Sequence, residues 1–157
     1  MPAVPGRPRD RALWPCPRCG RTFANSNQTH TCASLGDLDR HFAGSAPAVR
    51  AAFERILAVV DTLGPVTVLP EKTRIALHAR MSFAALVPRA RWLDGHLVLA
   101  RRVERPRFRR IDEYSPRNIV HAFRLTSPDD VDGELAGWIE EAYRVGEQRH
   151  LDDAARR

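Results

Sequence analysis

Four residues near the N-terminus have the spacing of a soft-metal site. Cys16 and Cys19 form a C-x2-C pair, and His30 and Cys32 form an H-x-C pair after ten intervening residues. One tight turn at a C-x2-C pair directs two thiolates at the same ion, and tetrahedral zinc takes four sulfur or imidazole ligands. Gly20, directly after the second cysteine, suits the positive φ of such a turn. The motif therefore predicts a zinc ion bound by these four residues.

The predicted zinc is structural, because protein side chains fill all four ligand positions and leave none open for a substrate. Two other interpretations remain for the cysteines: three reduced thiols beside a surface histidine, or a disulfide. A disulfide leaves one cysteine over, and no apolar run follows Arg7, Arg9 and Arg11 to form a secretion signal. No apolar stretch is long enough to span a membrane. We therefore expect a cytoplasmic protein with no membrane partner.

The chain is expected to divide into four segments. Prolines and a glycine in residues 1–13 predict a flexible tail, and residues 14–34 form the zinc-knuckle-like module, with Trp14 and Phe23 as its apolar supports. Residues 38–151 form the main domain, and residues 152–157 a flexible C-terminus. Leu38 and Phe42, at helical spacing, are expected to pack the module on the main domain.

Helical spacing of apolar residues predicts one helix near each end of the main domain. The first begins with Ser45 as N-cap, ends before Gly64, and has a buried stripe consisting of Val49, Phe53, Ile56, Leu57 and Val60. The second opens at Ser127, where a proline and two acidic residues suit a helix start. It ends at Gly146, and its buried stripe consists of Val131, Leu135, Trp138, Ile139 and Ala142.

Between these helices, apolar alternation predicts strands at residues 66–69, 73–80, 81–87, 93–101 and 120–125. The predicted fold class is α+β: an N-terminal zinc knuckle followed by a mainly antiparallel sheet, with a helix before it and a helix after it.

Basic residues cluster in the connection after the fourth of these strands. The net charge is +6, and arginine supplies all basic residues except Lys72. A genome rich in G and C would explain many arginines, but it does not explain their clustering. The clustered arginines, with Pro106 and Phe108 among them, are Arg101, Arg102, Arg105, Arg107, Arg109 and Arg110. A basic surface of this kind, beside a metal module, favours a non-enzymatic protein that binds nucleic-acid phosphates.

A second hypothesis places a small phosphorylated or carboxylated ligand on one face of the sheet. Guanidinium groups bind such oxyanions through paired hydrogen bonds, and histidine can transfer protons. The candidate residues are Lys72, Arg74, His78 and Arg80, joined by Arg124 or His121 according to strand register. The alternative is a solvated face whose arginines pair with the acidic last helix. No recognisable catalytic motif is present, so whether the protein is an enzyme stays open, and a protein-interaction adaptor is a third reading.

The chain also resembles a known family in several segments: CPRCGRTFANSNQTHTC, HFAGSAPAVRAAFERI, LGPVTVLPEKTRIALHARMSFAAL, WLDGHLVLARR and HAFRLTSPDDVD. They are similar to an uncharacterised bacterial domain family in which a knuckle-like N-terminus precedes an α+β domain. The resemblance covers roughly residues 14–151. It implies the fold pattern and the metal positions Cys16, Cys19, His30 and Cys32, but no substrate and no catalytic residue.

Overall fold

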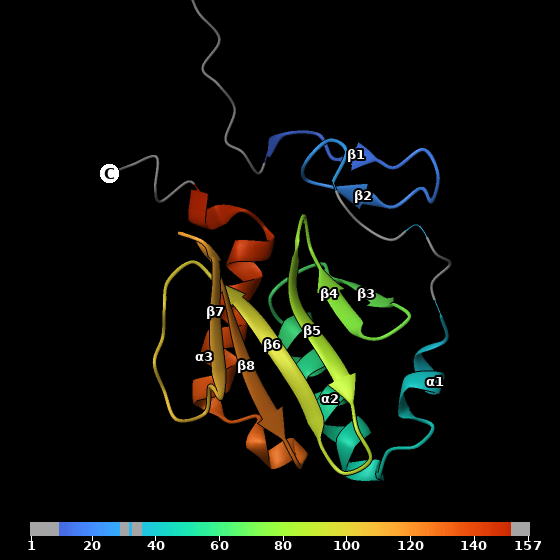
Figure 1. Ribbon diagram of the computed structural model, residues 1–157, viewed down its shortest axis with the longest axis vertical. Coiled ribbons are helices and arrows are strands. Elements are labelled where there is room, and N and C mark those ends of the chain that lie inside the picture. The colour runs from blue at the N-terminus through green and yellow to red at the C-terminus, as the bar shows by residue number, and fades with distance from the viewer. Residues whose placement is uncertain (1–9, 29–31, 33–35, 152–157) are drawn as a thin grey trace, which may run out of the picture.

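The computed structural model describes residues 10–28, 32 and 36–151 (Figure 1). In these residues a small N-terminal hairpin of β1 (Trp14–Pro15) and β2 (Thr22–Phe23) precedes α1 (Leu38–Phe42) and α2 (Pro47–Asp61). A six-stranded sheet follows, made of β3 (Thr67–Pro70), β4 (Ile75–His78), β5 (Ser82–Pro88), β6 (Leu93–Leu99), β7 (Arg110–Ser115) and β8 (Asn118–Leu125). A short 3-10 helix (Pro128–Asp130) and α3 (Gly133–Gly146) complete the chain. The predicted α+β class is confirmed.

The large sheet is antiparallel throughout, in the order β3-β4-β5-β6-β8-β7. Strands β3 to β6 follow one another as neighbours, but β7 lies at the edge and β8 returns between β6 and β7. Because β6 and β7 are both antiparallel to β8, they run in the same direction, and the connection between them must pass β8 and return along it. That connection contains most of the arginine cluster, and we call residues 100–109 the β6–β7 loop.

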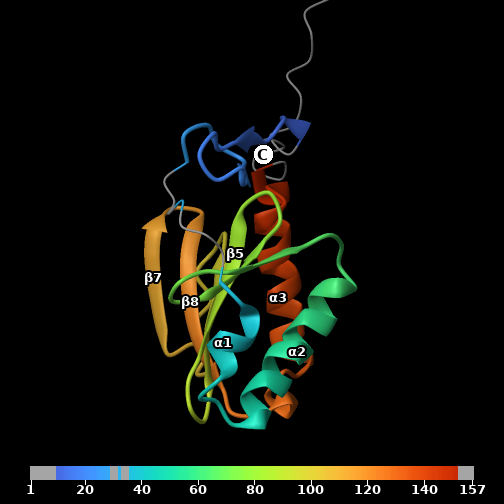
Figure 2. The same ribbon diagram turned by 90° about the vertical axis from the view of Figure 1, so that its right-hand side faces the viewer.

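Helices α2 and α3 cover one face of the sheet (Figure 2). Strand register explains this arrangement, because alternate residues of β6 and β8 point to the helix side and are buried there. They are Leu93, Gly95 and Leu97 of β6 and Phe123 and Leu125 of β8. The opposite face, which we call the open face, contains half-buried side chains from the alternate positions. Its residues on β5, β6 and β8 include Val87, Asp94, His96, Val98, Val120, Ala122 and Arg124.

The structure corrects two predictions about the segment before α2. Ser45 is not the N-cap: the α2 N-cap is Ala46, and the Ser45 hydroxyl donates to the Arg89 carbonyl at 2.7 Å. Leu38 and Phe42 do lie on a helix, but Phe42 packs on Phe53 of α2 at 5.1 Å between ring centroids rather than on the N-terminal hairpin. This contact secures α1 to the main core.

The last helix begins later than predicted. Ser127 and Asp130 form the expected capping box, but it closes only a 3-10 turn, since Val131 leaves helical geometry with ψ at 77°. Asp132 then caps α3 by accepting from the Leu135 N–H at 2.9 Å. The predicted end at Gly146 is confirmed. Four members of the predicted stripe are buried on α3, and Val131 is buried but lies before the helix.

Strand β7 was not predicted, because its sequence RIDEYS has neither apolar alternation nor a buried side chain. Pairing with β8 alone holds this edge strand in the sheet. The predicted strand at 73–80 is shorter in the structure and ends at His78. Among the described residues, no helix is both long and apolar enough to cross a lipid bilayer.

We expect Gly95→Ala to destabilise the fold. A Cβ at Gly95 would lie 2.6 Å from Phe123 and 2.9 Å from Leu86, so the core would have to shift, at a cost of about 1–3 kcal/mol. The matched control is Gly137→Ala at an exposed position of α3, where a Cβ meets nothing within 4 Å and helix propensity favours alanine. Urea denaturation of both variants measures the difference. Equal stability of the two variants would contradict the packing described here.

Candidate functional site

The N-terminal module has the turn that the cysteine spacing predicts. Gly20 has a φ of 73°, and its N–H donates to the Cys16 carbonyl at 2.8 Å. The Cys16 N–H in turn donates to the Arg21 carbonyl at 2.8 Å, which closes the loop between β1 and β2. Trp14 and Phe23 pair across this hairpin with ring centroids 6.2 Å apart. The two predicted apolar supports therefore contact each other.

The three cysteines converge on one point although Cys32 is far from the others in sequence. The Sγ atoms of Cys16, Cys19 and Cys32 all lie within 4.8 Å of one another, and Cys16 and Cys32 Sγ are 3.7 Å apart. A disulfide has a bond of about 2.0 Å, whereas a tetrahedral site with metal–sulfur bonds of about 2.3 Å has edges of about 3.8 Å. The spacing of the sulfurs fits a shared metal ion. His30 lies outside the described residues.

The electrostatics of the thiols suit a cation at this point. The backbone N–H of Cys19, and to a smaller extent that of Arg18, lowers the pKa of the Cys16 thiol. Desolvation raises the pKa of Cys32, and the nearby Cys16 and Cys19 thiols raise it further. Ionising one thiol therefore opposes ionising the next unless a positive ion lies between them.

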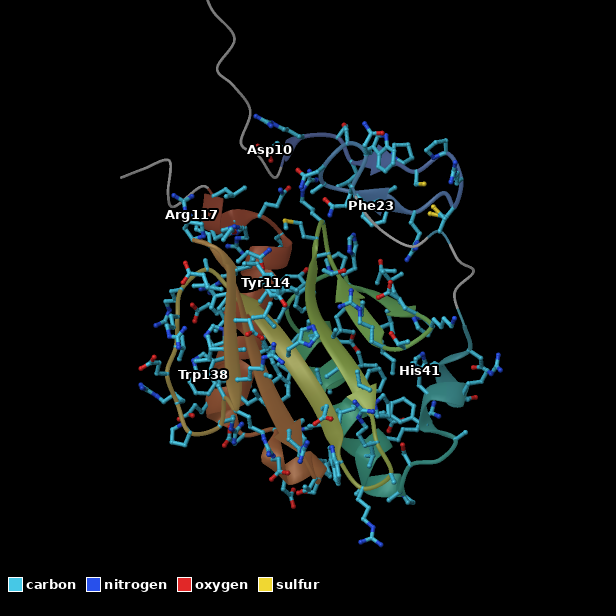
Figure 3. The ribbon with its side chains drawn as sticks, in the orientation of Figure 1. Asp10, Phe23, His41, Tyr114, Arg117 and Trp138 are labelled. Atoms are coloured by element: carbon cyan, nitrogen blue, oxygen red, sulfur yellow. The ribbon has the colours of Figure 1, made fainter. Side chains whose placement is uncertain are left out.

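The module contacts the end of the large sheet (Figure 3) through Phe23 and its neighbour Arg21. The Phe23 ring meets the His78 ring edge to face at 6.0 Å, and the Arg21 guanidinium lies 3.6 Å from the Glu71 carboxylate. Arg80, just beyond β4, donates to the Arg11 carbonyl. The module therefore packs on the start and end of β4, not on α1 as predicted.

Two of the predicted anion-binding residues are structural histidines. His78 is only 6% exposed beneath Phe23, and its Nδ1 lies 3.1 Å from the Ser82 hydroxyl. His121 is fully buried: Nε2 accepts from the Val103 N–H at 2.9 Å and Nδ1 lies 3.0 Å from the Ile119 carbonyl. These partners assign a neutral ring that donates through Nδ1. Neither histidine is positioned to meet a ligand.

The cationic members of the predicted anion site are spread over the surface. Lys72 is exposed between β3 and β4, and Arg80 donates to Gln148 at 3.0 Å. Arg74 donates through Nε to Glu71 at 3.0 Å. Arg124 lies on the open face, bound to Asp94. The six predicted residues therefore do not form one site. Arg74, directly before β4, is close enough to His96 on the open face to lower its pKa.

The arginine cluster divides into two groups. Arg101 makes a bidentate pair with Glu141 of α3 at 2.8 and 3.1 Å, and Arg107 makes another with Asp132 at 2.7 and 3.1 Å. These two arginines attach the β6–β7 loop to α3. Phe108 is also buried, with its ring 4.7 Å from that of Trp138. Three of the residues that suggested a nucleic-acid surface thus belong to the fold.

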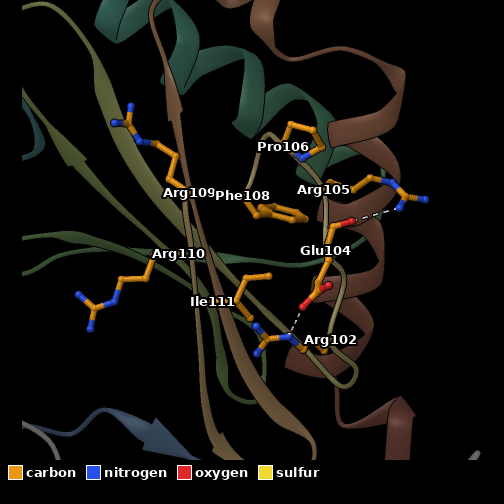
Figure 4. A pocket seen from close by; sticks show the side chains of 8 residues that line it. All are labelled: Arg102, Glu104, Arg105, Pro106, Phe108, Arg109, Arg110 and Ile111. Carbon is orange, nitrogen blue, oxygen red and sulfur yellow. Dashed lines mark hydrogen bonds and ion pairs between the residues drawn. The ribbon is translucent and has the colours of Figure 1, made fainter.

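The remaining arginines surround a hollow of about 460 Å³ at the surface (Figure 4). Its lining consists of Arg102, Glu104, Arg105, Pro106, Phe108, Arg109, Arg110 and Ile111. Arg102 pairs with Glu104 at 2.8 Å and Arg110 with Asp112 at 2.7 Å. Arg105 donates to the Glu104 carbonyl, and neither Arg105 nor Arg109 has a carboxylate partner within the described part of the chain. We call this feature the arginine hollow.

Sequence reasoning did not name His96 as a candidate site residue, although it lies within the predicted strand at residues 93–101. His96 lies in the middle of β6 on the open face, between Ala85 of β5 and Ala122 of β8. Burial, and then the nearby Arg74 cation, lower the pKa of His96. The alternation of buried and half-buried residues along β6 places its side chain on the face opposite the core.

We expect acid to destabilise the protein partly through His121. Burial lowers the pKa of His121 below its value of about 6.5 in an unfolded chain. Its contribution to stability is therefore complete above that value and is lost as the pH falls below it, because the unfolded state takes up the proton first. Urea denaturation at about pH 7.5 and about pH 5.5 should show lower stability at the acidic pH. His121→Gln should reduce that difference, and an NMR titration of His121 at or above the unfolded value would contradict the prediction.

Comparison with known proteins gave a family match for part of the chain. No curated protein and no solved structure matched the chain. A family model matches residues 38–146, which span α1 to the end of α3 and leave out the cysteine module. The chain therefore belongs to the family described as domain of unknown function DUF5655.

Proposed function

We propose that this protein is a zinc-stabilised, non-enzymatic module that binds nucleic acid through the arginine hollow. The observation that carries the proposal is the composition of the hollow: its lining includes four arginines, Arg102, Arg105, Arg109 and Arg110, but one carboxylate, Glu104. All four arginines are exposed, and Arg105 and Arg109 keep their charge uncompensated by any carboxylate of the described residues. Because phosphates attract such groups whatever the base sequence, we expect weakly specific, salt-dependent binding.

The position of the hollow also suits a long ligand. It opens beside the edge strand β7, and Tyr114 on that strand is 72% exposed. Exposed aromatic rings on single-strand binding surfaces stack on bases. We therefore favour single-stranded nucleic acid that runs along β7, with phosphates at the hollow and a base on Tyr114.

The zinc part of the proposal rests on the three converging sulfurs, with His30 as the fourth ligand. An ion held this way has no free coordination position, so its role is to fold the module. Thiolate ligands require a reducing compartment, and we accordingly propose a cytoplasmic location.

Titration with Co²⁺ tests the metal site. Wild-type protein should bind one ion, with visible bands of tetrahedral geometry and thiolate charge-transfer bands. Cys16→Ser should lose most of this binding. His30→Ala should weaken it while keeping the charge-transfer bands of three thiolates, and the control His41→Ala, on α1, should behave as wild type. Unchanged affinity in Cys16→Ser would contradict the centre, and unchanged affinity in His30→Ala would exclude His30 as a ligand.

Removal of the metal from the wild-type protein tests whether the ion stabilises the module alone. The buried core cluster begins at Phe42 and includes no residue of the module. A strong chelator should therefore collapse the amide NMR signals of residues 14–28 while those of α2, α3 and the sheet remain dispersed. Global unfolding on chelation would show instead that the domain depends on the ion.

Nucleic-acid binding is measured by fluorescence anisotropy with random-sequence single-stranded DNA and RNA at low salt. Arg105→Ala combined with Arg109→Ala should weaken binding, and the slope of log affinity against log salt should fall by about 0.7 for each lost phosphate contact. The charge-matched control is Arg144→Ala combined with Arg149→Ala. Arg144 lies in the last turn of α3 and Arg149 lies beyond its end, so this variant should retain most of the affinity. Absence of wild-type binding at low salt, or equal losses in both double variants, would contradict the proposal.

A further inference from the structure

A second cationic group lies on the open face and has His96 at its centre, with Arg110 of the arginine hollow further along the same row, beyond Ala122. Strand register sets His96 in a row with Ala76, Ala85 and Ala122, one residue from each of the strands β4, β5, β6 and β8. No long side chain therefore stands beside the imidazole within its own row. We propose that the open face around His96 binds a small phosphate or carboxylate anion, held by Arg74 and Arg124 and hydrogen-bonded by His96.

The two arginines are already oriented by the protein. The Nε–H of Arg74 donates a hydrogen bond to Glu71 Oε1 at 3.0 Å, and the Nε–H of Arg124 donates one to Asp94 Oδ1 at 2.9 Å. The Arg124 guanidinium also lies over the Trp92 ring, 4.3 Å from its centroid. Holding a guanidinium by Nε leaves its two terminal nitrogens side by side, which is the edge that grips an oxyanion with two hydrogen bonds. Within the described residues, these terminal nitrogens have no bond in either arginine.

His96 offers the third polar group. In the described part of the chain its ring makes no hydrogen bond, whereas the rings of His78, His121 and His41 each make at least one. A neutral imidazole has one N–H donor and one acceptor, so it can bond either to a phosphate oxygen or to a hydroxyl of the same ligand. Burial and Arg74 both favour this neutral form.

The charges of the open face select an anion over a metal ion. Asp94 is shared between Arg124 and Arg89, at 2.9 and 3.2 Å, so two cations neutralise one carboxylate. The pKa of Asp94 is lowered mainly by its hydrogen bond to Arg124, against the opposing effect of its own burial. A divalent cation beside His96 would meet these guanidinium groups, whereas a phosphate or carboxylate would complete their hydrogen bonds.

The test uses the full chain with inorganic phosphate, pyrophosphate and succinate as probes. Wild-type His96 imidazole signals and the amides of Gly95 and Ala122 should move saturably in NMR spectra as a probe is added. Arg74→Ala should weaken binding of that probe about tenfold or more, the effect of losing a charge-assisted contact. His96→Gln should also weaken binding of the probe. Arg124→Lys keeps the positive charge but loses the paired hydrogen bonds, so this variant should bind the probe more weakly as well.

Two controls separate this site from other effects. Arg144→Ala, which removes an exposed cation that pairs with Glu140 on α3, should bind the probes as wild type. The Arg105→Ala and Arg109→Ala double variant should also bind them as wild type, even if it loses nucleic acid. Absence of saturable change with all three probes, or equal affinity in Arg74→Ala and Arg144→Ala, would overturn the proposal. Dispersed amide spectra of each variant show that it is folded.

Discussion

Close packing of one sheet face against α2 and α3 is the constraint on which the rest of the structure depends. Gly95 has no side chain, so Phe123 and Leu86 close over it in the core. Successive residues of a strand point to opposite faces, so this contact also sends His96 and Arg124 to the open face. A slip of one residue between β6 and β8 would exchange the two sets and bury the charges. The core thus decides which polar side chains can meet a ligand.

The same core controls the β6–β7 loop. His121, inside the sheet–helix layer, accepts from the Val103 N–H, and Phe108 packs on Trp138. Of the two arginines between these points, Arg105 is exposed, whereas Arg107 is half-buried. Arg101 and Arg107 then reach carboxylates of α3 and its cap. The arginine cluster, which looks like one basic surface in the sequence, therefore has two roles in the structure. Some of its arginines form ion pairs that stabilise the fold, and the others line the exposed hollow.

The cysteine module is stabilised by interactions of a different kind from those of the main domain. Its hairpin pairs only two residues on each strand, too few to bury a core, and its sulfurs converge at tetrahedral spacing. It touches the domain mainly through Phe23 and Arg21 near β4. The match to the family begins after it, at Leu38. Module and domain are therefore joined by a small contact, and each is ordered by its own interactions.

Much of the fold could be predicted from short-range patterns in the sequence. The α+β class, the buried stripes of both long helices, the Gly20 turn and the strands with apolar alternation follow from spacing over a few residues. Strand β7 could not be recognised, because RIDEYS is a strand only through its pairing with β8. The start of α3 was misplaced because two capping signals, at Ser127 and Asp132, compete locally and only the packing of Val131 separates them.

By itself, the sequence determined the metal-ligand spacing, the helix faces and the excess of arginine, since each depends on residue identity and local periodicity. Tertiary structure alone decided which charges stay free and which histidines are buried. Glu141 lies 40 residues from Arg101, and His78 is covered by Phe23, 55 residues before it. Such pairings depend on how distant segments pack, so no local pattern in the chain encodes them.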